Sequence, residues 1–257
     1  MTQSYLRVGD VEMRFGGLLA LGGVSFGVER GSVVGLIGPN GSGKTTLMNI
    51  ISGVFKPTAG QVEFAGRRIA DVPTSRVCTL GIARTFQVVR PFANLTVREN
   101  VAVGSMYGRD GGKRSTAQAF AAADELVEFV GLARVATRNA GDLTIPDRKR
   151  LELAKALALD PEVLLLDEVM AGLNATEVDE ALALLRQVHA RGTTLIVVEH
   201  LMKAIMSISQ RVIVLAEGIV IADGAPQDVT RRPEVIKAYL GTRYAERQAR
   251  LNPGSSA

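Results

Sequence analysis

The segment GPNGSGKTT, residues 38–46, constrains the fold of this chain more than any other stretch. It fits the template G-x-x-x-x-G-K-[ST], in which glycines let the backbone curl and point successive N–H groups at a triphosphate. The lysine reaches the outer phosphates, and the hydroxyl after it binds Mg²⁺. We therefore predict a nucleotide-binding loop formed by Gly38, Pro39, Asn40, Gly41, Ser42, Gly43, Lys44, Thr45 and Thr46, with Thr45 also a ligand of Mg²⁺.

The residues on either side of this loop favour the same interpretation. Residues 33–37 form the apolar run VVGLI, which predicts a buried strand, and residues 45–51 predict a helix whose N-terminus faces the phosphates. The alternative, a glycine-rich structural turn, does not require a strand before it and a helix after it.

Length and composition limit the class of protein. A chain of 257 residues accommodates one large α/β domain, or a core domain with a small subdomain. It contains no apolar run of about 18 residues, and the opening MTQSYLRVGD lacks the apolar segment of a secretory signal. The single cysteine, Cys78, excludes an internal disulfide. The net charge of +4 includes no basic block interleaved with aromatics, so we predict no nucleic-acid partner.

The remaining pattern predicts an α/β core interrupted by helices. Alternation within residues 5–30 indicates antiparallel strands, and a further strand is expected at 82–86. Helical periodicity then covers 96–106, 116–130 and 147–159, before strands and helices alternate again from residue 163. We predict an α/β core from 1–88 and 160–241 with an N-terminal β subdomain, a helical insertion at 89–159, and a tail at 242–257.

Polar side chains follow the later buried strands. Asp167 and Glu168 end the run VLLLDE, and parallel α/β sheets bind ligands at these carboxyl ends. We assign Asp167 to Mg²⁺ and Glu168 to polarisation of the attacking water. His200 follows the strand at 194–198 and is expected to approach the γ-phosphate, while the amide oxygen of Gln87 is expected to join the Mg²⁺ shell. An ordinary surface histidine and an ordinary loop amide are the alternatives.

Together these motifs resemble the ATP-binding subunit of an ABC transporter over residues 5–241. The segments FGGL at 15–18, ARTFQ at 83–87, AGLN at 171–174, EHLMK at 199–203 and AYLG at 238–241 are most similar to the ATPases of branched-chain amino acid importers. The resemblance implies an α/β P-loop NTPase fold of the ABC type, with an antiparallel β subdomain and a helical subdomain. It also implies that Phe15 stacks on adenine, that Gln87 and Asp167 serve Mg²⁺, and that Glu168 and His200 are catalytic.

The same resemblance implies partners and a location. An importer ATPase uses ATP and Mg²⁺, docks on two permease subunits at the cytoplasmic face of the inner membrane, and works with an extracytoplasmic solute-binding protein. A second, different ATPase subunit is usual in this family, with a homodimer as the alternative. Competing functions are a soluble ABC-type ATPase acting on DNA or ribosomes, which usually carries coiled-coil insertions or two cassettes, and a small-molecule P-loop kinase, which does not require Glu168 and His200.

One segment departs from the family pattern. The signature L-S-G-G-Q is replaced by LTIPD at 143–147. Thr144 keeps a hydroxyl and is expected to act as an N-cap, whereas Pro146 has no N–H to donate and Asp147 would repel a phosphate. The sequence therefore predicts a dimer with unequal sites, in which this segment forms the weaker one. The alternative is that the neighbouring cations Arg148 and Lys149 offset Asp147.

Overall fold

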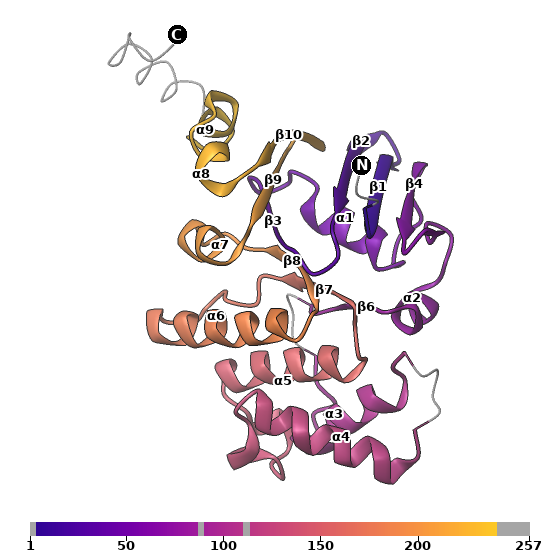
Figure 1. Cartoon of the computed structure of the whole chain (residues 1–257), viewed down its shortest axis with the longest axis vertical. Coiled ribbons are helices and arrows are strands. Elements are labelled where there is room, and N and C mark those ends of the chain that lie inside the picture. The colour runs from indigo at the N-terminus through magenta and orange to yellow at the C-terminus, as the bar shows by residue number, and fades with distance from the viewer. Residues whose placement is uncertain (1–3, 87–89, 110–113, 241–257) are drawn as a thin grey trace.

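The computed structural model describes residues 4–86, 90–109 and 114–240. Its larger sheet has the strand order β10-β9-β3-β8-β7-β6 (Figure 1). The strands are β3 (Val33–Ile37), β6 (Ile82–Arg84), β7 (Val163–Asp167), β8 (Thr194–Val198), β9 (Arg211–Ala216) and β10 (Ile219–Gly224). All neighbours are parallel except β9 and β10, which form the expected hairpin. Strands β3, β7 and β8 are buried along their whole length, as expected for a parallel sheet covered on both faces.

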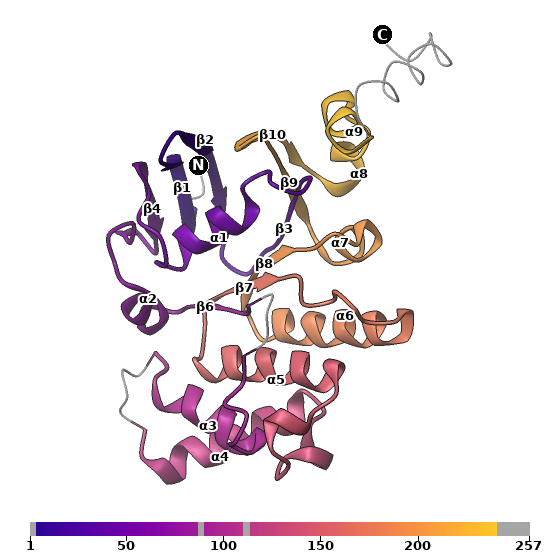
Figure 2. The ribbon, with the colours of Figure 1, turned by 180° about the vertical axis from the view of Figure 1, so that it is seen from behind.

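A second, antiparallel sheet has the order β2-β1-β4-β5 and confirms the strands expected before the phosphate loop. Its strands are β1 (Leu6–Phe15), β2 (Leu18–Val28), β4 (Ala59–Phe64) and β5 (Arg67–Arg68). Helix α1 (Lys44–Ile51) lies beside this sheet (Figure 2). Its buried side chains Leu47, Met48, Ile50 and Ile51 share one apolar core with β1, β2 and the larger sheet. This core holds the start of α1, and hence the phosphate loop, in place.

The other helices cover the larger sheet and extend beyond it. They are α2 (Thr74–Leu80), α3 (Val97–Met106), α4 (Thr116–Phe129), α5 (Ile145–Ala158), α6 (Ala175–Ala190), α7 (Met202–Ile208), α8 (Pro226–Val229) and α9 (Pro233–Leu240), with 3₁₀ turns η1 (Ala133–Val135) and η2 (Ala140–Asp142). Helices α3, α4 and α5 group together below the sheet in Figure 1. They lie inside the predicted insertion at 89–159, whose boundaries stay a prediction.

Local sequence explains where these helices begin. Thr96 and Ser115 each accept a hydrogen bond from the backbone of the residue three positions later, and the side chains of Glu99 and Gln118 bond back. Such reciprocal capping boxes satisfy backbone donors that a helix N-terminus leaves open. Helices α2, α8 and α9 are short and were not predicted, because about two turns of helix give too little periodicity to recognise.

Strand β6 is shorter than the expected strand at 82–86. Its ladder to β7 ends with Arg84 opposite Leu165, although the Thr85 N–H still donates to the Leu165 carbonyl at 2.9 Å. Because β7 is its only strand neighbour in the described sheet, β6 ends where that ladder ends.

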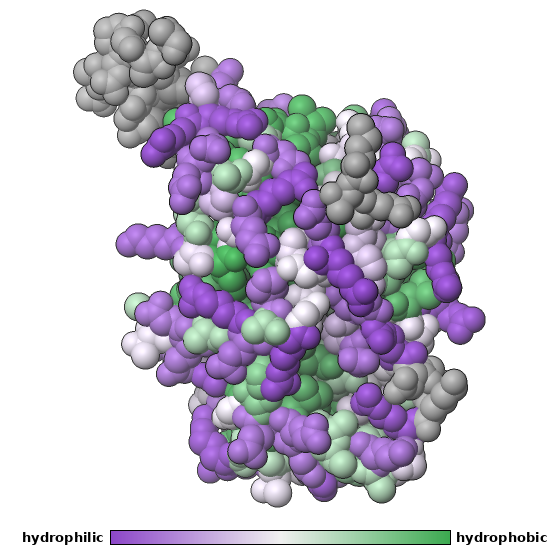
Figure 3. Space-filling view, in the orientation of Figure 1, coloured by the Kyte–Doolittle hydropathy of each residue, from purple (hydrophilic) through white to green (hydrophobic). Residues whose placement is uncertain are grey.

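The surface seen in Figure 3 is covered mostly by hydrophilic side chains, with smaller apolar areas between them. In the part of the chain that the structure describes, no helix combines the length and apolar character needed to cross a membrane.

Candidate functional site

The predicted nucleotide-binding loop joins the end of β3 to the start of α1. Two of its glycines are required by close approach as well as by backbone conformation. A Cβ on Gly38 would lie 2.0 Å from the carbonyl oxygen of Leu215. A Cβ on Gly43, where φ is +103°, would lie 2.6 Å from Cδ2 of Leu21. Glycine at these two positions therefore lets the loop backbone pack directly against Leu215 and Leu21.

Lys44 places a buried cation at the centre of this loop. Its side chain is almost fully enclosed, and its Nζ donates to the carbonyls of Gly38 at 2.8 Å and Pro39 at 2.9 Å. Burial lowers the pKa of Lys44, while the charges of Glu168 and Asp167 oppose that shift. A desolvated ammonium held by backbone carbonyls attracts a polyanion strongly, so the loop fits a triphosphate.

The predicted Mg²⁺ ligands Thr45 and Asp167 lie at the same edge of the sheet. Both line one open hollow, together with Asn49 and Arg84. The Thr45 hydroxyl is exposed, whereas Asp167 is 2% exposed at the end of β7. A hydroxyl and a carboxylate are hard oxygen donors of the kind Mg²⁺ prefers, so this donor set fits that ion. Gln87, the third predicted ligand, lies outside the described residues.

Glu168 and His200, the predicted catalytic residues, meet where β7 and β8 end. His200 Nε2 lies 2.6 Å from Oε1 of Glu168, in hydrogen-bond contact. Glu168 has φ +50°, an uncommon backbone conformation for a non-glycine residue. Its N–H donates to Val198 at 2.9 Å, and its carbonyl accepts from Lys149 Nζ at 2.9 Å. Contacts on both sides of the peptide thus hold the strained turn and aim the carboxylate at the histidine.

Glu199 is a site residue that sequence reasoning missed. It is 2% exposed, and its Oε1 accepts from the backbone N–H of Met170 at 2.7 Å. Burial raises the pKa of Glu199, against the opposing contributions of the Met170 hydrogen bond and the Lys149 charge. The acidic residue directly before His200 was the available signal. The hydrogen bond from Met170 to Glu199 holds the backbone of the turn that follows Glu168.

Phe15, the predicted adenine contact, ends β1 and is 43% exposed. Its ring meets that of Phe55 edge to face, with centroids 5.5 Å apart. This exposure does not fit an ordinary core phenylalanine, and stacking on adenine stays a prediction.

The LTIPD segment forms a closed helix N-terminus. Thr144 Oγ1 accepts from the N–H of Asp147 at 3.4 Å, which confirms the predicted N-cap role. Pro146 occupies the second position of α5 and offers no donor. Asp147 is 4% exposed, and both its carboxylate oxygens accept from Nη2 of Arg134, at 2.6 and 2.9 Å. A carboxylate of the protein itself thus occupies the helix end that would otherwise attract an anion.

The partner of Asp147 is not one of the two neighbouring cations. Arg148 Nη2 donates to the carbonyl of Gly141 at 2.7 Å, and Lys149 Nζ donates to that of Glu168. In the described part of the chain, neither residue makes a hydrogen bond or an ion pair with Asp147. Arg134 on η1 does so, because the fold brings η1 beside the start of α5.

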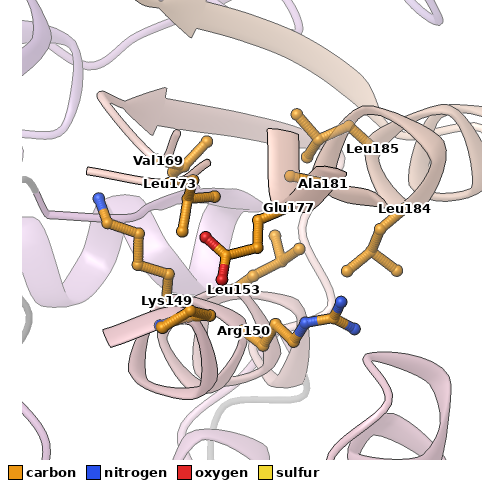
Figure 4. A pocket seen from close by; sticks show the side chains of 10 residues that line it. Lys149, Arg150, Leu153, Val169, Leu173, Glu177, Ala181, Leu184 and Leu185 are labelled. Atoms are coloured by element: carbon orange, nitrogen blue, oxygen red, sulfur yellow. The ribbon is translucent and has the colours of Figure 1, made fainter. Parts of the chain in front are cut away.

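A separate cavity lies between α5 and α6 (Figure 4). Its wall is largely aliphatic and includes Leu153, Val169, Leu173, Ala181, Leu184 and Leu185, with the carboxylate of Glu177 among them in Figure 4. A triphosphate needs convergent donors rather than an aliphatic wall, so this cavity does not fit one, whereas the glycine-rich loop does.

Sequence comparison places the chain among known proteins. Residues 21–171 match the ABC transporter family model, and residues 220–245 match the model described as branched-chain amino acid ATP-binding cassette transporter. The chain is 40% identical to the high-affinity branched-chain amino acid transport ATP-binding protein LivG of Salmonella typhimurium, over 94% of this chain and 99% of the relative. It is 39% identical to BraF of Pseudomonas aeruginosa, with the same coverage.

Solved structures agree with this assignment and confirm the expected fold. A nucleotide-free ATP-binding cassette from an ABC transporter superposes with a TM-score of 0.83 at 29% identity, covering 92% of this chain and 99% of that one. The ADP conformation of a cassette superposes with a TM-score of 0.82 at 30% identity, covering 93% and 100%. The phosphate loop, the acid pair and the histidine thus lie in a chain that belongs to the ABC transporter family of ATP-binding proteins.

Proposed function

We propose that this chain is the ATP-hydrolysing subunit of an importer that takes up branched-chain amino acids or a related small polar solute. The observation that carries this proposal is the Glu168–His200 contact at the same sheet edge as the buried Lys44 and Asp167. The solute class rests on the similarity to LivG and BraF, whose names specify branched-chain amino acid transport.

Binding of ATP uses the loop and its surroundings. The N–H groups of residues 38–46 and the ammonium of Lys44 bind the phosphates, which replace the carbonyls that now hold this lysine. Phe15 stacks on the adenine ring. Thr45, Asp167 and Gln87 hold Mg²⁺, which neutralises charge on the outer phosphates.

Hydrolysis depends on Glu168 and His200. Glu168 orients and polarises the attacking water, and His200 fixes the carboxylate from the neighbouring strand end. The Lys149 and Glu199 contacts keep the backbone around Glu168 in its strained conformation. Release of ADP and phosphate then reopens the site.

The partners are two permease subunits, a second ATP-binding subunit and an extracytoplasmic solute-binding protein, at the cytoplasmic face of the inner membrane. The permeases dock where the helical insertion at 89–159 meets the core. Phe86 and Phe92 flank this junction and are 48% and 53% exposed, and apolar side chains left in the open often mark protein contacts.

The closed N-terminus of α5 favours a heterodimer. The Asp147 carboxylate and its Arg134 partner fill the segment that corresponds to the family signature. A second subunit with an intact signature would complete the site formed by Lys44, Glu168 and His200, whereas a second copy of this chain would not.

Purification of tagged protein from detergent-solubilised native membranes tests this function. Mass spectrometry should identify two multi-span permeases and a second ATPase, and cells carrying Glu168→Gln should lose uptake of labelled leucine. Recovery with nucleic acid or ribosomes would support the competing soluble ATPase instead. Normal leucine uptake by the variant would contradict a role of this chain in leucine import.

A further inference from the structure

Arg84, the last residue of β6, contacts the carboxylate of Asp167, the predicted Mg²⁺ ligand at the end of the neighbouring strand β7. Its Nη2 donates to Oδ2 of Asp167 at 2.6 Å, and its Nη1 donates to Oδ1 of Asn49 on α1 at 2.5 Å. The two charged side chains are 5% and 2% exposed. Among the described residues, no other donor contacts this carboxylate, so its orientation depends on Arg84.

The ends of β6 and β7 are joined by more than the strand ladder. Arg84 lies opposite Leu165 in the register, two residues before Asp167, so its side chain reaches forward along β7. Beyond the ladder, the N–H of Asp167 donates to Oγ1 of Thr85 at 3.2 Å. Arg84 at the end of β6 and Thr85 directly after it therefore hold the side chain and the backbone of Asp167.

The contact between Arg84 and Asp167 is a buried ion pair, so its loss would change the charge balance as well as the packing. A buried carboxylate that loses a paired cation is poorly compensated, which costs more than loss of both partners. Lys44, the other cation whose charge acts on Asp167, is held by the carbonyls of Gly38 and Pro39. Arg84 also suits the task better than a lysine would, because its planar fork bridges Asp167 and Asn49 at once.

We propose that Arg84 is a positioning residue for the Mg²⁺–ATP site. It holds one oxygen of the Asp167 carboxylate so that the other is presented to the metal shell, and it ties this carboxylate to α1 through Asn49. The inference rests on the proposed function, because it requires that Asp167 serve Mg²⁺. Arg84 acts through Asp167 and is not itself a catalytic residue.

The first test measures the Mg²⁺ dependence of nucleotide binding. Calorimetry follows AMP-PNP binding to the full chain in EDTA and across Mg²⁺ concentrations, for the wild type, Arg84→Gln and Arg84→Lys. Arg211→Gln is the matched control, because it removes an arginine paired with Asp223 on the hairpin strands. Arg84→Gln should need about 10–100-fold more Mg²⁺ for half of the metal-dependent gain in affinity, with affinity in EDTA within about threefold of the wild type.

The outcomes distinguish failure of the Arg84 proposal from failure of the proposed Mg²⁺–ATP site. Arg84→Lys should fall between the wild type and Arg84→Gln, and Arg211→Gln should match the wild type. An unchanged Mg²⁺ requirement in Arg84→Gln, beside a Mg²⁺-dependent wild type, would overturn the role of Arg84 alone. A wild type that binds the nucleotide equally with and without Mg²⁺ would overturn the proposed Mg²⁺–ATP site, and the inference with it.

A second test uses thermal unfolding without nucleotide in EDTA. Arg84→Gln should lower the unfolding midpoint by about 10 °C, because it removes the cation that is hydrogen-bonded to the buried Asp167 carboxylate. Adding Asp167→Asn removes that charge and should restore roughly half of the loss. A double variant no more stable than Arg84→Gln would show that Arg84 only fills space, and would overturn the proposal.

Discussion

Two helix N-termini in this molecule differ in both backbone geometry and chemistry, because α1 follows a left-handed Gly43 and α5 follows an extended Thr144. Helix α1 begins after Gly43, which has no side chain to cap it, and its first turn contains no acidic residue. Helix α5 begins after Thr144, which caps it, and carries the buried carboxylate of Asp147 at its third position. The positive end of the first helix stays open to an anion, whereas that of the second is satisfied from within. Both the cap residue and the side chains of the first turn therefore decide whether a helix N-terminus stays open to phosphate.

We expect the largest effect from Glu168→Gln, which tests whether a nucleotide bound at the N-terminus of α1 is hydrolysed with the help of Glu168. Glu168→Gln removes the carboxylate that we propose polarises water, but leaves the loop and Lys44 unchanged. ATP hydrolysis should fall about 10²–10⁴-fold, the range of general acid–base contributions. Equilibrium nucleotide binding, measured beside it, should change little. A variant with near-normal turnover would remove Glu168 from the mechanism.

A carboxylate placed at the N-terminus of α1 should make it resemble that of α5. Thr46 occupies the third position of α1, as Asp147 does in α5. Thr46→Asp should therefore weaken ATP binding by roughly 100-fold through repulsion of the phosphates, while the nucleotide-free fold remains stable because a carboxylate suits this helix end. Thr46→Asn is the neutral control, and calorimetry reports the affinity. Equal affinities for the two variants would contradict the electrostatic account.

The reverse change should open the closed terminus. Substituting Ile145→Gly, Pro146→Gly and Asp147→Gln restores a backbone donor and removes the carboxylate. In a Glu168→Gln background this variant should form an ATP-dependent homodimer about tenfold more tightly than its parent, equivalent to one added charge-assisted contact. Analytical ultracentrifugation with and without ATP measures the change. Strong ATP-dependent dimerisation of the Glu168→Gln parent alone would instead contradict the unequal-site proposal.

The smallest effect concerns the buried carboxylate beside the catalytic turn. Burial raises the pKa of Glu199 above its unfolded value, so the folded state binds more protons between those two pKa values. Stability therefore falls as pH rises through this window, which begins near pH 4.5. Glu199→Gln keeps an acceptor for the Met170 N–H and removes this pH-dependent loss of stability. The difference in unfolding free energy between variant and wild type should shift in favour of the variant as pH increases, as urea titrations at several pH values would show.

Local sequence was sufficient for the parts of this protein that depend on neighbouring residues. The apolar runs before residues 38, 167 and 199 predict buried strands, because a parallel sheet covered on both faces leaves no polar alternation. Gly43, Lys44 and Thr45 identify the phosphate loop, because its geometry is built within one turn of chain. The N-cap role of Thr144 follows for the same reason.

Only the tertiary structure decided which charges meet. Arg84 and Asp167 are 83 positions apart in the sequence, and Met170 and Glu199 are 29 apart. Neither pair shares a helix face or a turn, so no local periodicity connects its members. The same holds for Arg134, which pairs with Asp147 in place of Arg148 and Lys149 because η1 packs beside α5. Sequence determines where backbone and apolar surface will be buried, whereas the partner of a buried charge depends on distances that exist only after the chain has folded.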